Sequence, residues 1–219
     1  MLLALLLGCA PALTRFPGPL DRLGKGAVEP LGALWARRDN APDPTSGSTT
    51  TGRKVADAAN TFVGKGALVV RGESFRYDCS GLVEAALAKA GLSLDGSSLM
   101  LFDEAHARGV FHRRHLPKPG DVAFWDNTYD RDKNGRLDDA VTHSGIVVGV
   151  DAAGTIDLVH LGSQGVAHIH MNLKHPHDRL DAHGEVQNDY LRAKSGHDPF
   201  GTEYLAGELW VGFAAFYGG

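Results

Sequence analysis

Apolar residues recur at helical spacing in three stretches of the chain, and each stretch is bounded by a residue that caps or ends helices. In RKVADAANTFVGKG, residues 53–66, the apolar positions share one helical face, and the run stops at a glycine. SGLVEAALAKAG, residues 80–91, has the same spacing and also ends at a glycine. SSLMLFDEAHARG, residues 97–109, opens on a serine, a residue type that caps helix N-termini. The pattern predicts three helices in this order.

A strand pattern replaces the helical pattern after a Pro-Gly turn. KPGDVAFWD, residues 118–126, predicts one strand. SGIVVGVDAAGTIDLVHLGSQGVAHIHMN, residues 144–172, predicts two or three antiparallel strands with turns at 151–154 and 162–165. ELWVGFAAF, residues 208–216, predicts a last strand. Helices followed by an antiparallel meander indicate an α+β domain in which the N-terminal helices pack on a central sheet.

Residues 10–52 have a composition typical of a linker. PALTRFPGPL and DNAPDPTSGSTTTG are rich in proline, glycine, serine and threonine, and they show little apolar periodicity. We therefore predict a flexible tether over residues 10–52 and one folded domain over residues 53–219.

The first nine residues, MLLALLLGC, resemble the end of a bacterial lipoprotein signal. Leu6-Leu7-Gly8-Cys9 matches the lipobox, in which the cysteine becomes the lipid-modified first residue of the mature protein. No basic residue precedes the short apolar run, so an apolar N-terminus without function is the alternative. The resemblance implies export to the bacterial periplasm or cell envelope, with membrane anchoring through Cys9 as in an outer-membrane lipoprotein.

Composition places the chain among soluble globular proteins and argues against some functions. Of the 219 residues, 43% are hydrophobic and 22% are charged, and the formal net charge is -4. Because there is no basic surplus, we expect no nucleic-acid partner. No stretch is apolar for long enough to span a bilayer. The two cysteines, Cys9 and Cys79, lie far apart in the sequence and cannot make a disulfide framework.

Cys79 stands directly before the second predicted helix, in SFRYDCSGLVEAALAKAGL. A helix N-terminus offers unpaired backbone N–H groups and the positive end of the helix dipole. Both favour a thiolate, the nucleophilic form of cysteine, and the same N–H groups can hold an oxyanion. We expect Asp78, Ser80 and Gly81 to set the start of this helix. A buried structural thiol is the alternative for such a cysteine taken alone.

A nucleophilic cysteine needs a base and a polar group that orients the base, and two of the eleven histidines are placed for these roles. His143 opens one predicted strand and His160 ends the next, so antiparallel pairing can bring them together. Gln164 and His168 are alternatives to His160 in the orienting role. Cys79, His143 and His160 are thus a candidate set for acyl transfer.

Four motifs, YDCSGLV, LPKPGDVAFWD, THSGIVVGV and IDLVHLGSQGV, follow one another in an order that resembles the NlpC-type cysteine peptidases. These are papain-like enzymes that cut stem peptides of bacterial cell walls. The resemblance covers residues 53–170, and residues 171–219 carry no recognisable family motif. It implies that Cys79 is the nucleophile, His143 the base and His160 the orienting residue. It also implies cleavage between D-glutamate and a diamino acid.

One departure from the family pattern lies just before the nucleophile. GKGALVVRGESFRY has Ala67 where the family commonly has a tyrosine whose hydroxyl helps to shape the substrate site. Two alternative functions stay open: a peptidoglycan amidase that acts at the sugar–peptide junction, and a non-catalytic wall-binding module. We expect peptidoglycan as the partner, a monomeric chain, and no cofactor required for catalysis.

The acidic segment DNTYDRDKNGRLDDAVTH, residues 126–143, follows the pattern of a calcium loop. The residues that match positions 1, 3, 5, 6 and 9 are Asp130, Asp132, Asn134, Gly135 and Asp138. Position 12 is Val141 instead of an acid, and Asp139 or Asp126 could take its place. A structural Ca²⁺ here would order the strand that carries His143. A polar turn without metal is the alternative, because turns favour these residue types.

The remaining histidines include three close pairs that invite a metal interpretation. The pairs are His112 with His115, His168 with His170, and His175 with His177. No cysteine or well-spaced third ligand accompanies them, so we interpret them as solvated surface residues and not as a zinc site. Asp103 and Glu104 are expected on an exposed helix face, and Trp125 in the core or the wall of a cleft.

Overall fold

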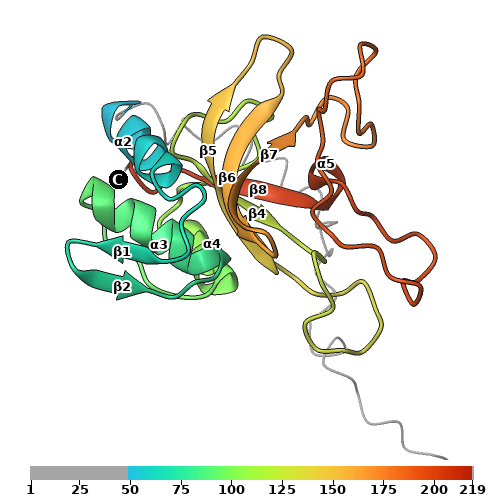
Figure 1. Cartoon of the computed structure of the whole chain (residues 1–219), viewed down its shortest axis with the longest axis horizontal. Coiled ribbons are helices and arrows are strands. Elements are labelled where there is room, and N and C mark those ends of the chain that lie inside the picture. The colour runs from blue at the N-terminus through green and yellow to red at the C-terminus, as the bar shows by residue number, and fades with distance from the viewer. Residues whose placement is uncertain (1–48, 219) are drawn as a thin grey trace, which may run out of the picture. The chain divides into compact units, whose positions relative to one another are not determined.

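Residues 49–218 are described by the structure, a computed structural model in which helices come first and most strands follow (Figure 1). The elements in chain order are α2 (Thr49–Asn60), β1 (Leu68–Val70), β2 (Glu73–Phe75), α3 (Cys79–Ala90), α4 (Ser98–Ala107), β3 (Phe111–His112), β4 (Val122–Trp125), β5 (His143–Val150), β6 (Ile156–Gly162), β7 (Gly165–Met171), α5 (Ala206–Leu209) and β8 (Trp210–Ala214). The predicted α+β class is confirmed. The expected signal remnant at 1–9, with Cys9, and most of the expected tether lie outside the described residues.

Six strands form one antiparallel sheet in the order β3-β8-β4-β5-β6-β7. The meander predicted over 144–172 is present as β5, β6 and β7. β5 pairs with β4 so that Trp125 lies opposite His143, and with β6 so that Gly145 lies opposite His160. The register therefore brings His143 and His160 to neighbouring positions at one end of the sheet.

The N-terminal helices cover one face of this sheet (Figure 1). α2 and α3 pack on β5 and on each other. The apolar residues that the helical spacing predicted, such as Val55, Leu82 and Leu87, are fully buried in the core between helices and sheet. Burying one such side chain stabilises the fold by about 1.5–3 kcal/mol. The three predicted helices are confirmed.

A small hairpin that the periodicity did not indicate stands beside α3. β1 and β2 pair antiparallel with Val70 opposite Glu73. The two residues between them, Arg71 and Gly72, have φ values of 51° and 87°. Two consecutive residues with positive φ make the tight turn that matches the twist of paired strands.

The C-terminal region, which carries no recognised motif, covers the opposite face of the sheet. Residues from its loops and from α5 join residues of β6, β7 and β8 in a second core. The strand predicted over 208–216 is β8, and it lies between β3 and β4 within the sheet. Residues 171–219 are therefore part of the fold and not an appendage.

The folded part begins earlier than the composition indicated. α2 starts at Thr49, inside the segment 10–52 that was expected to be a tether. A Cβ added at Gly52 would lie 2.6 Å from the carbonyl oxygen of Pro119 and 2.8 Å from the ring of Tyr217. The first turn of α2 thus packs closely against two segments that are distant in sequence, and composition cannot reveal such contacts. Among the described residues, no helix is sufficiently long and apolar to cross a membrane.

Candidate active site

The chain enters α3 through a tightly fixed turn that presents Cys79. Asp78 is the N-cap: its Oδ1 accepts hydrogen bonds from the Gly81 N–H at 2.7 Å and from Ser80 Oγ at 3.0 Å. A Cβ at Gly81 would collide with the carbonyl oxygen of Arg76, so only glycine allows the chain to fold back this closely. The N–H of Cys79 itself is left at the helix tip, where it can donate to an anion.

His143 and His160 are joined by a hydrogen bond across the β5–β6 pair. Nε2 of His143 lies 2.9 Å from Nδ1 of His160, and the two rings meet edge to face. The buried Trp125 lies behind His143, with ring centroids 5.7 Å apart, and its Nε1 donates to the carbonyl oxygen of Ala206 at 2.9 Å. The start of α5, in the C-terminal region, therefore fixes the indole that backs His143. Of the two positions expected for Trp125, core or cleft wall, the structure places it in the core, where it is fully buried.

Burial keeps both imidazoles neutral at physiological pH. Removal from water, and then the neighbouring His160, lower the pKa of His143 from 6.5 to about 3. Burial also lowers the pKa of His160 to about 4, although the negative charge of Asp189 acts in the opposite direction. His143 is therefore present in the neutral form that a general base requires.

One of the two tautomers that the His143–His160 hydrogen bond allows is suited to catalysis. If Nε2 of His143 donates to Nδ1 of His160, the remaining Nδ1 of His143 carries a lone pair that can accept a proton. Gly162 leaves room for the His160 ring: a Cβ there would lie 2.8 Å from Cε1 of His160. The glycine at the end of β6 thus helps to set the orientation of His160.

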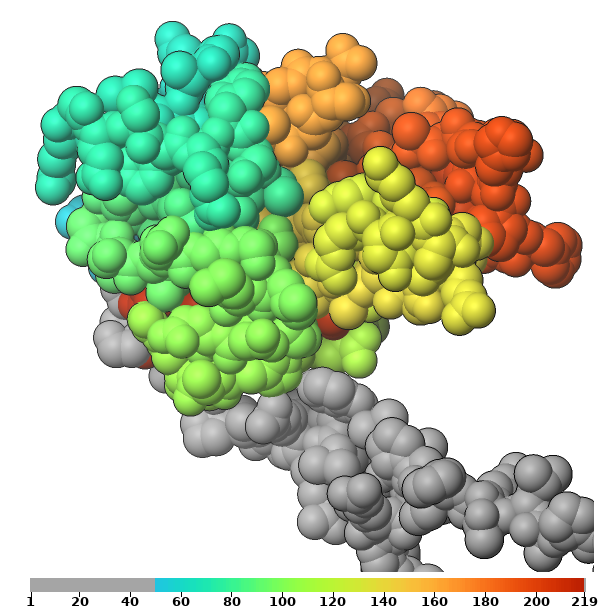
Figure 2. Space-filling model, turned by 90° about the horizontal axis from the view of Figure 1, so that it is seen from below, coloured from blue at the N-terminus to red at the C-terminus, as the bar shows by residue number. Residues whose placement is uncertain are grey.

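Two hollows meet at Cys79. A cleft of about 670 Å³ contains Cys79, His143 and His160 and extends along β7 to Tyr190. A smaller hollow of about 200 Å³ lies beside the starts of α3 and α4, and Cys79 and Tyr129 line both spaces. Figure 2 shows a furrow on this side of the molecule, between the green surface of the helical layer and the yellow surface of the acidic loop. A substrate chain can therefore cross the thiol with a part on either side.

Two hydrogen bonds beside the nucleophile, one of the sulfur to Ser98 and one of Ser98 to Ser144, were not foreseen from the sequence. The free thiol of Cys79 lies 3.4 Å from Oγ of Ser98, the first residue of α4, and Ser98 lies 2.9 Å from Oγ of Ser144. The sulfur's hydrogen bond thus runs to a serine, while His143 lines the same cleft. A serine at a helix start is usually interpreted as a cap, so the sequence position of Ser98 gave no signal of its contact with the sulfur.

Tyrosines from other positions line the cleft in place of the one that the family pattern has at residue 67. Tyr77 lies two residues before the nucleophile, and its hydroxyl donates to the carbonyl oxygen of Lys65 at 2.6 Å. Tyr129, in the acidic loop, is about half exposed over both hollows. An aromatic next to the nucleophile motif was visible in the sequence, whereas the position of Tyr129 depends on the folding of its loop.

Of the two alternatives for the orienting role, the structure gives neither a contact with His143. Nδ1 of His168 is bonded to Oδ1 of Asp157 at 2.8 Å, and Gln164 lines the cleft. His160 is the residue whose ring nitrogen meets His143.

The acidic loop folds around its own carboxylates. Oδ1 and Oδ2 of Asp130 accept from the N–H groups of Asn134 and Gly135 at 3.1 and 2.9 Å. Carboxylate oxygens of Asp130, Asp132 and the buried Asp139 lie within 4.8 Å of one another. Asp139 is thus the acid that could complete this candidate cation site. Asp138 accepts from the amide of Asn134 at 3.2 Å.

Asp126, the other acid considered for this loop, has a different role. Its Oδ1 accepts from the N–H of Val141 at 2.6 Å, and Val141 has φ 45°, in the left-handed region. A β-branched residue rarely adopts this conformation, so the bond to Asp126 helps to hold the turn that leads into His143. Burial raises the pKa of Asp126.

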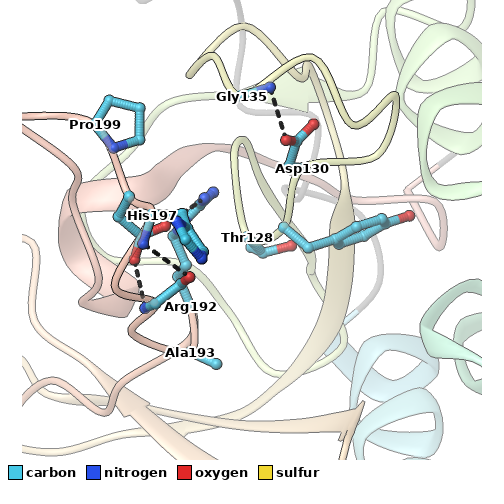
Figure 3. Close-up of a pocket in the computed structure, with 10 residues that line it drawn as sticks. Thr128, Asp130, Gly135, Arg192, Ala193, His197 and Pro199 are labelled. Atoms are coloured by element: carbon cyan, nitrogen blue, oxygen red, sulfur yellow. Dashed lines mark hydrogen bonds and ion pairs between the residues drawn. The ribbon is translucent and has the colours of Figure 1, made fainter.

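A third hollow, of about 290 Å³, continues from the cleft between the acidic loop and residues 192–199. Figure 3 shows Asp130, bonded to the Gly135 N–H, on one side and Arg192 and His197 on the other. Arg192 is buried and holds two segments together: it donates to the carbonyl oxygen of Asn127 at 2.6 Å and to Asp198 at 3.0 Å. The C-terminal region therefore supports the acidic loop next to the cleft.

Three of the other paired histidines contact carboxylates, whereas the ring of His115 lies edge-on to Trp210 with centroids 6.0 Å apart. His170 bonds Asp189, His175 lies 3.6 Å from Asp178, and His177 bonds Glu208. All three are at least partly exposed, as expected for surface residues. His112 differs: it is buried, with Nε2 3.1 Å from Oδ2 of the fully buried Asp121. The surface assignment was wrong for His112, because its strand pairs with β8 and its ring lies 5.6 Å from that of the buried Phe213, centroid to centroid.

No family model matches the chain, and no curated protein matches it. One similar solved structure is a lipoprotein of the NLP/P60 family from Staphylococcus aureus, with 25% identity over 53% of this chain and 35% of that chain, at a TM-score of 0.35. Another is NlpC2 from Trichomonas vaginalis, with 20% identity over 58% of this chain and 43% of that chain, at a TM-score of 0.37. Both neighbours are NlpC-type proteins. This chain spans less than half of the length of either.

Proposed function

We propose that the chain is a cysteine peptidase that hydrolyses amide bonds in peptidoglycan stem peptides. The observation that carries the proposal is the meeting of Cys79, at the tip of α3, with the bonded pair His143 and His160 in one cleft. The order of the motifs around these residues supports a cell-wall substrate, and we propose the D-glutamyl–diamino acid bond as the target.

The chemistry divides the hydrolysis into two acyl transfers. His143 accepts the thiol proton as the sulfur of Cys79 attacks the amide carbonyl, and the N–H of Cys79 stabilises the oxyanion. The C–N bond then breaks, and His143 gives its proton to the departing amine, which leaves a thioester on Cys79. Water, deprotonated by His143, attacks the thioester and releases a carboxylic acid and the free thiol. His160 holds the ring of His143 in register throughout.

The thiol of Cys79 and the ring of His143 line one cleft, and the hydrogen bond of the sulfur runs to Ser98. Catalytic hydrogen bonds are often long before substrate binds and become short in the complex. The two hollows on either side of Cys79 give the acyl part and the amine part of a branched peptide separate places. The wide cleft suits a polymeric substrate better than a small free metabolite.

The test is digestion of purified peptidoglycan, with the released products identified by mass. We expect wild-type protein to release stem-peptide fragments with new D-glutamate carboxyl and diamino-acid amino ends. Release of intact stem peptides from the sugar would assign the amidase activity instead. If wild-type protein binds the wall and releases nothing, the proposal is wrong and the chain is a wall-binding module.

Two further parts of the proposal concern the surroundings of the catalytic domain. We propose that the protein is exported and held at the envelope by a lipid on Cys9, which labelling with a radioactive fatty acid in wild-type and Cys9→Ser cells would test. We also propose that the acidic loop takes up Ca²⁺ through Asp130, Asp132 and Asp139 in a structural role. The donor set fits this ion, because Ca²⁺ prefers carboxylate and carbonyl oxygens.

A further inference from the structure

The sulfur of Cys79 is the outer end of a chain of hydrogen bonds that continues through two serine hydroxyls into the core. Sγ lies 3.4 Å from Ser98 Oγ, which lies 2.9 Å from Ser144 Oγ. The chain thus joins the tip of α3 to the tip of α4 and to β5, the strand that begins with His143. Ser98 is 5% exposed and Ser144 is fully buried, so bulk water does not compete for these hydroxyls.

The direction of the hydrogen bonds can follow the charge of the sulfur. A serine hydroxyl has one proton and two lone pairs and rotates to suit its partners. With a thiolate, Ser144 donates to Ser98 and Ser98 donates to the sulfur, so both O–H dipoles point at the negative charge. With a neutral thiol the S–H group can donate to Ser98, and Ser98 can then donate to Ser144. Hydrogen bonds in such chains polarise and strengthen one another.

We propose that Ser98 and Ser144 form a relay that fixes the sulfur of Cys79 and favours its thiolate form. Ser98 acts directly on the reacting sulfur, and Ser144 is a positioning residue that orients the hydroxyl of Ser98. The inference rests on the proposed role of Cys79 as the nucleophile. It adds to the catalytic residues the hydroxyl groups that α4 and β5 place beside the sulfur.

Other charged and titratable groups line the hollows at the sulfur, and all of them are present in both wild type and the serine variants. Arg76, Tyr77 and Asp78 precede α3, Tyr129 and Arg131 belong to the acidic loop, and His143 and His160 come from β5 and β6. Because the serine hydroxyls carry no charge near neutral pH, removing them changes the hydrogen bond to the sulfur without changing this set of charges.

The experiment is alkylation of the full-length protein with iodoacetamide between pH 5 and 10, with the adduct on Cys79 quantified by peptide mass mapping. A hydrogen bond to a charged acceptor changes the equilibrium between thiolate and thiol by a factor of about ten or more. We therefore expect Ser98→Ala to slow alkylation at neutral pH about tenfold and to move the midpoint of the pH profile upward by about one unit. Ser144→Ala shifts the midpoint in the same direction by a smaller amount.

Ser97→Ala is the matched control, because this neighbouring serine caps α4 by accepting from the Met100 N–H at 3.3 Å. It should lower the melting temperature, because the cap is lost, and leave the midpoint of the alkylation profile unchanged. If Ser98→Ala does not fold, Ser144→Ala decides the question. Wild-type midpoints in folded serine variants would overturn the relay.

This result is separate from the digestion of peptidoglycan. If the serine variants raise the midpoint of the alkylation profile but wild-type protein releases no peptide, the proposed function is wrong and the relay is supported. If wild-type protein digests the wall but the serine variants have the wild-type midpoint, the relay is wrong and the proposed function is supported.

Discussion

Acidification should destabilise this protein through its buried histidine pair. The folded-state pKa values of His143 and His160 are lowered to about 3 and about 4, against 6.5 for an exposed histidine. Between these values the unfolded chain binds more protons than the folded one, so the free energy of unfolding falls as the pH falls below about 6.5. From pH 7 to pH 5, each histidine contributes a loss of about 2 kcal/mol, or about 4 kcal/mol for the pair.

Urea denaturation at pH 7 and pH 5 measures this loss, and a double variant isolates it. His143→Gln with His160→Gln removes both groups and should reduce the pH-dependent loss by about 4 kcal/mol. The raised pKa values of Glu84 and Asp126, which are due to burial, act in the opposite direction and cancel between the two proteins. His175→Gln, at an exposed position, should behave as wild type.

The refuting result is equally specific. If the double variant loses as much stability between pH 7 and pH 5 as wild type does, the two imidazoles are not held neutral by burial. His143 would then not be the neutral base on which the proposed chemistry depends.

Three further predictions concern other parts of the structure. Gly162→Ala should displace the His160 ring and lower kcat about tenfold with little change in KM. Steady-state kinetics on a soluble muropeptide measure this, and a wild-type kcat in the variant would refute the prediction. Tyr217→Phe removes the hydrogen bond of 2.6 Å to the buried Asp121. It should lower the free energy of unfolding in urea by about 2 kcal/mol while activity per folded molecule stays the same, and unchanged stability would contradict this role. Calcium chloride should raise the melting temperature of wild type but not of Asp130→Ala, and a chelator should reverse the rise. A wild-type melting temperature that ignores both additions would exclude the calcium site.

The parts of the fold that depend on local periodicity could be predicted from the sequence. The helices before residue 110 and the strands β5 to β7 show their spacing directly, and the nearness of His143 and His160 follows from strands that are adjacent in the chain. The position of Cys79 at a helix start follows from the glycine-bounded helical run that comes after it.

The features that depend on contacts between distant segments could not be predicted in this way. β8 lies within the sheet between β3 and β4, although about forty residues of loop separate it from β7. Ser98 reads as part of a helix start, and only the packing of α4 against α3 reveals its contact with the sulfur. In the sequence, Asp139 and Asp126 are equally good candidates for the missing acid of the acidic loop. In the structure, Asp139 lies with the other carboxylates, whereas Asp126 accepts a hydrogen bond from Val141.

The most direct test of the central claim is the rate of peptide release from purified peptidoglycan by wild type, Cys79→Ala, His143→Ala and the control His175→Ala, with folding verified by circular dichroism. The account predicts release by wild type and by the control, and none above background by Cys79→Ala or His143→Ala. Release by folded Cys79→Ala at the wild-type rate would contradict a nucleophilic role for this thiol.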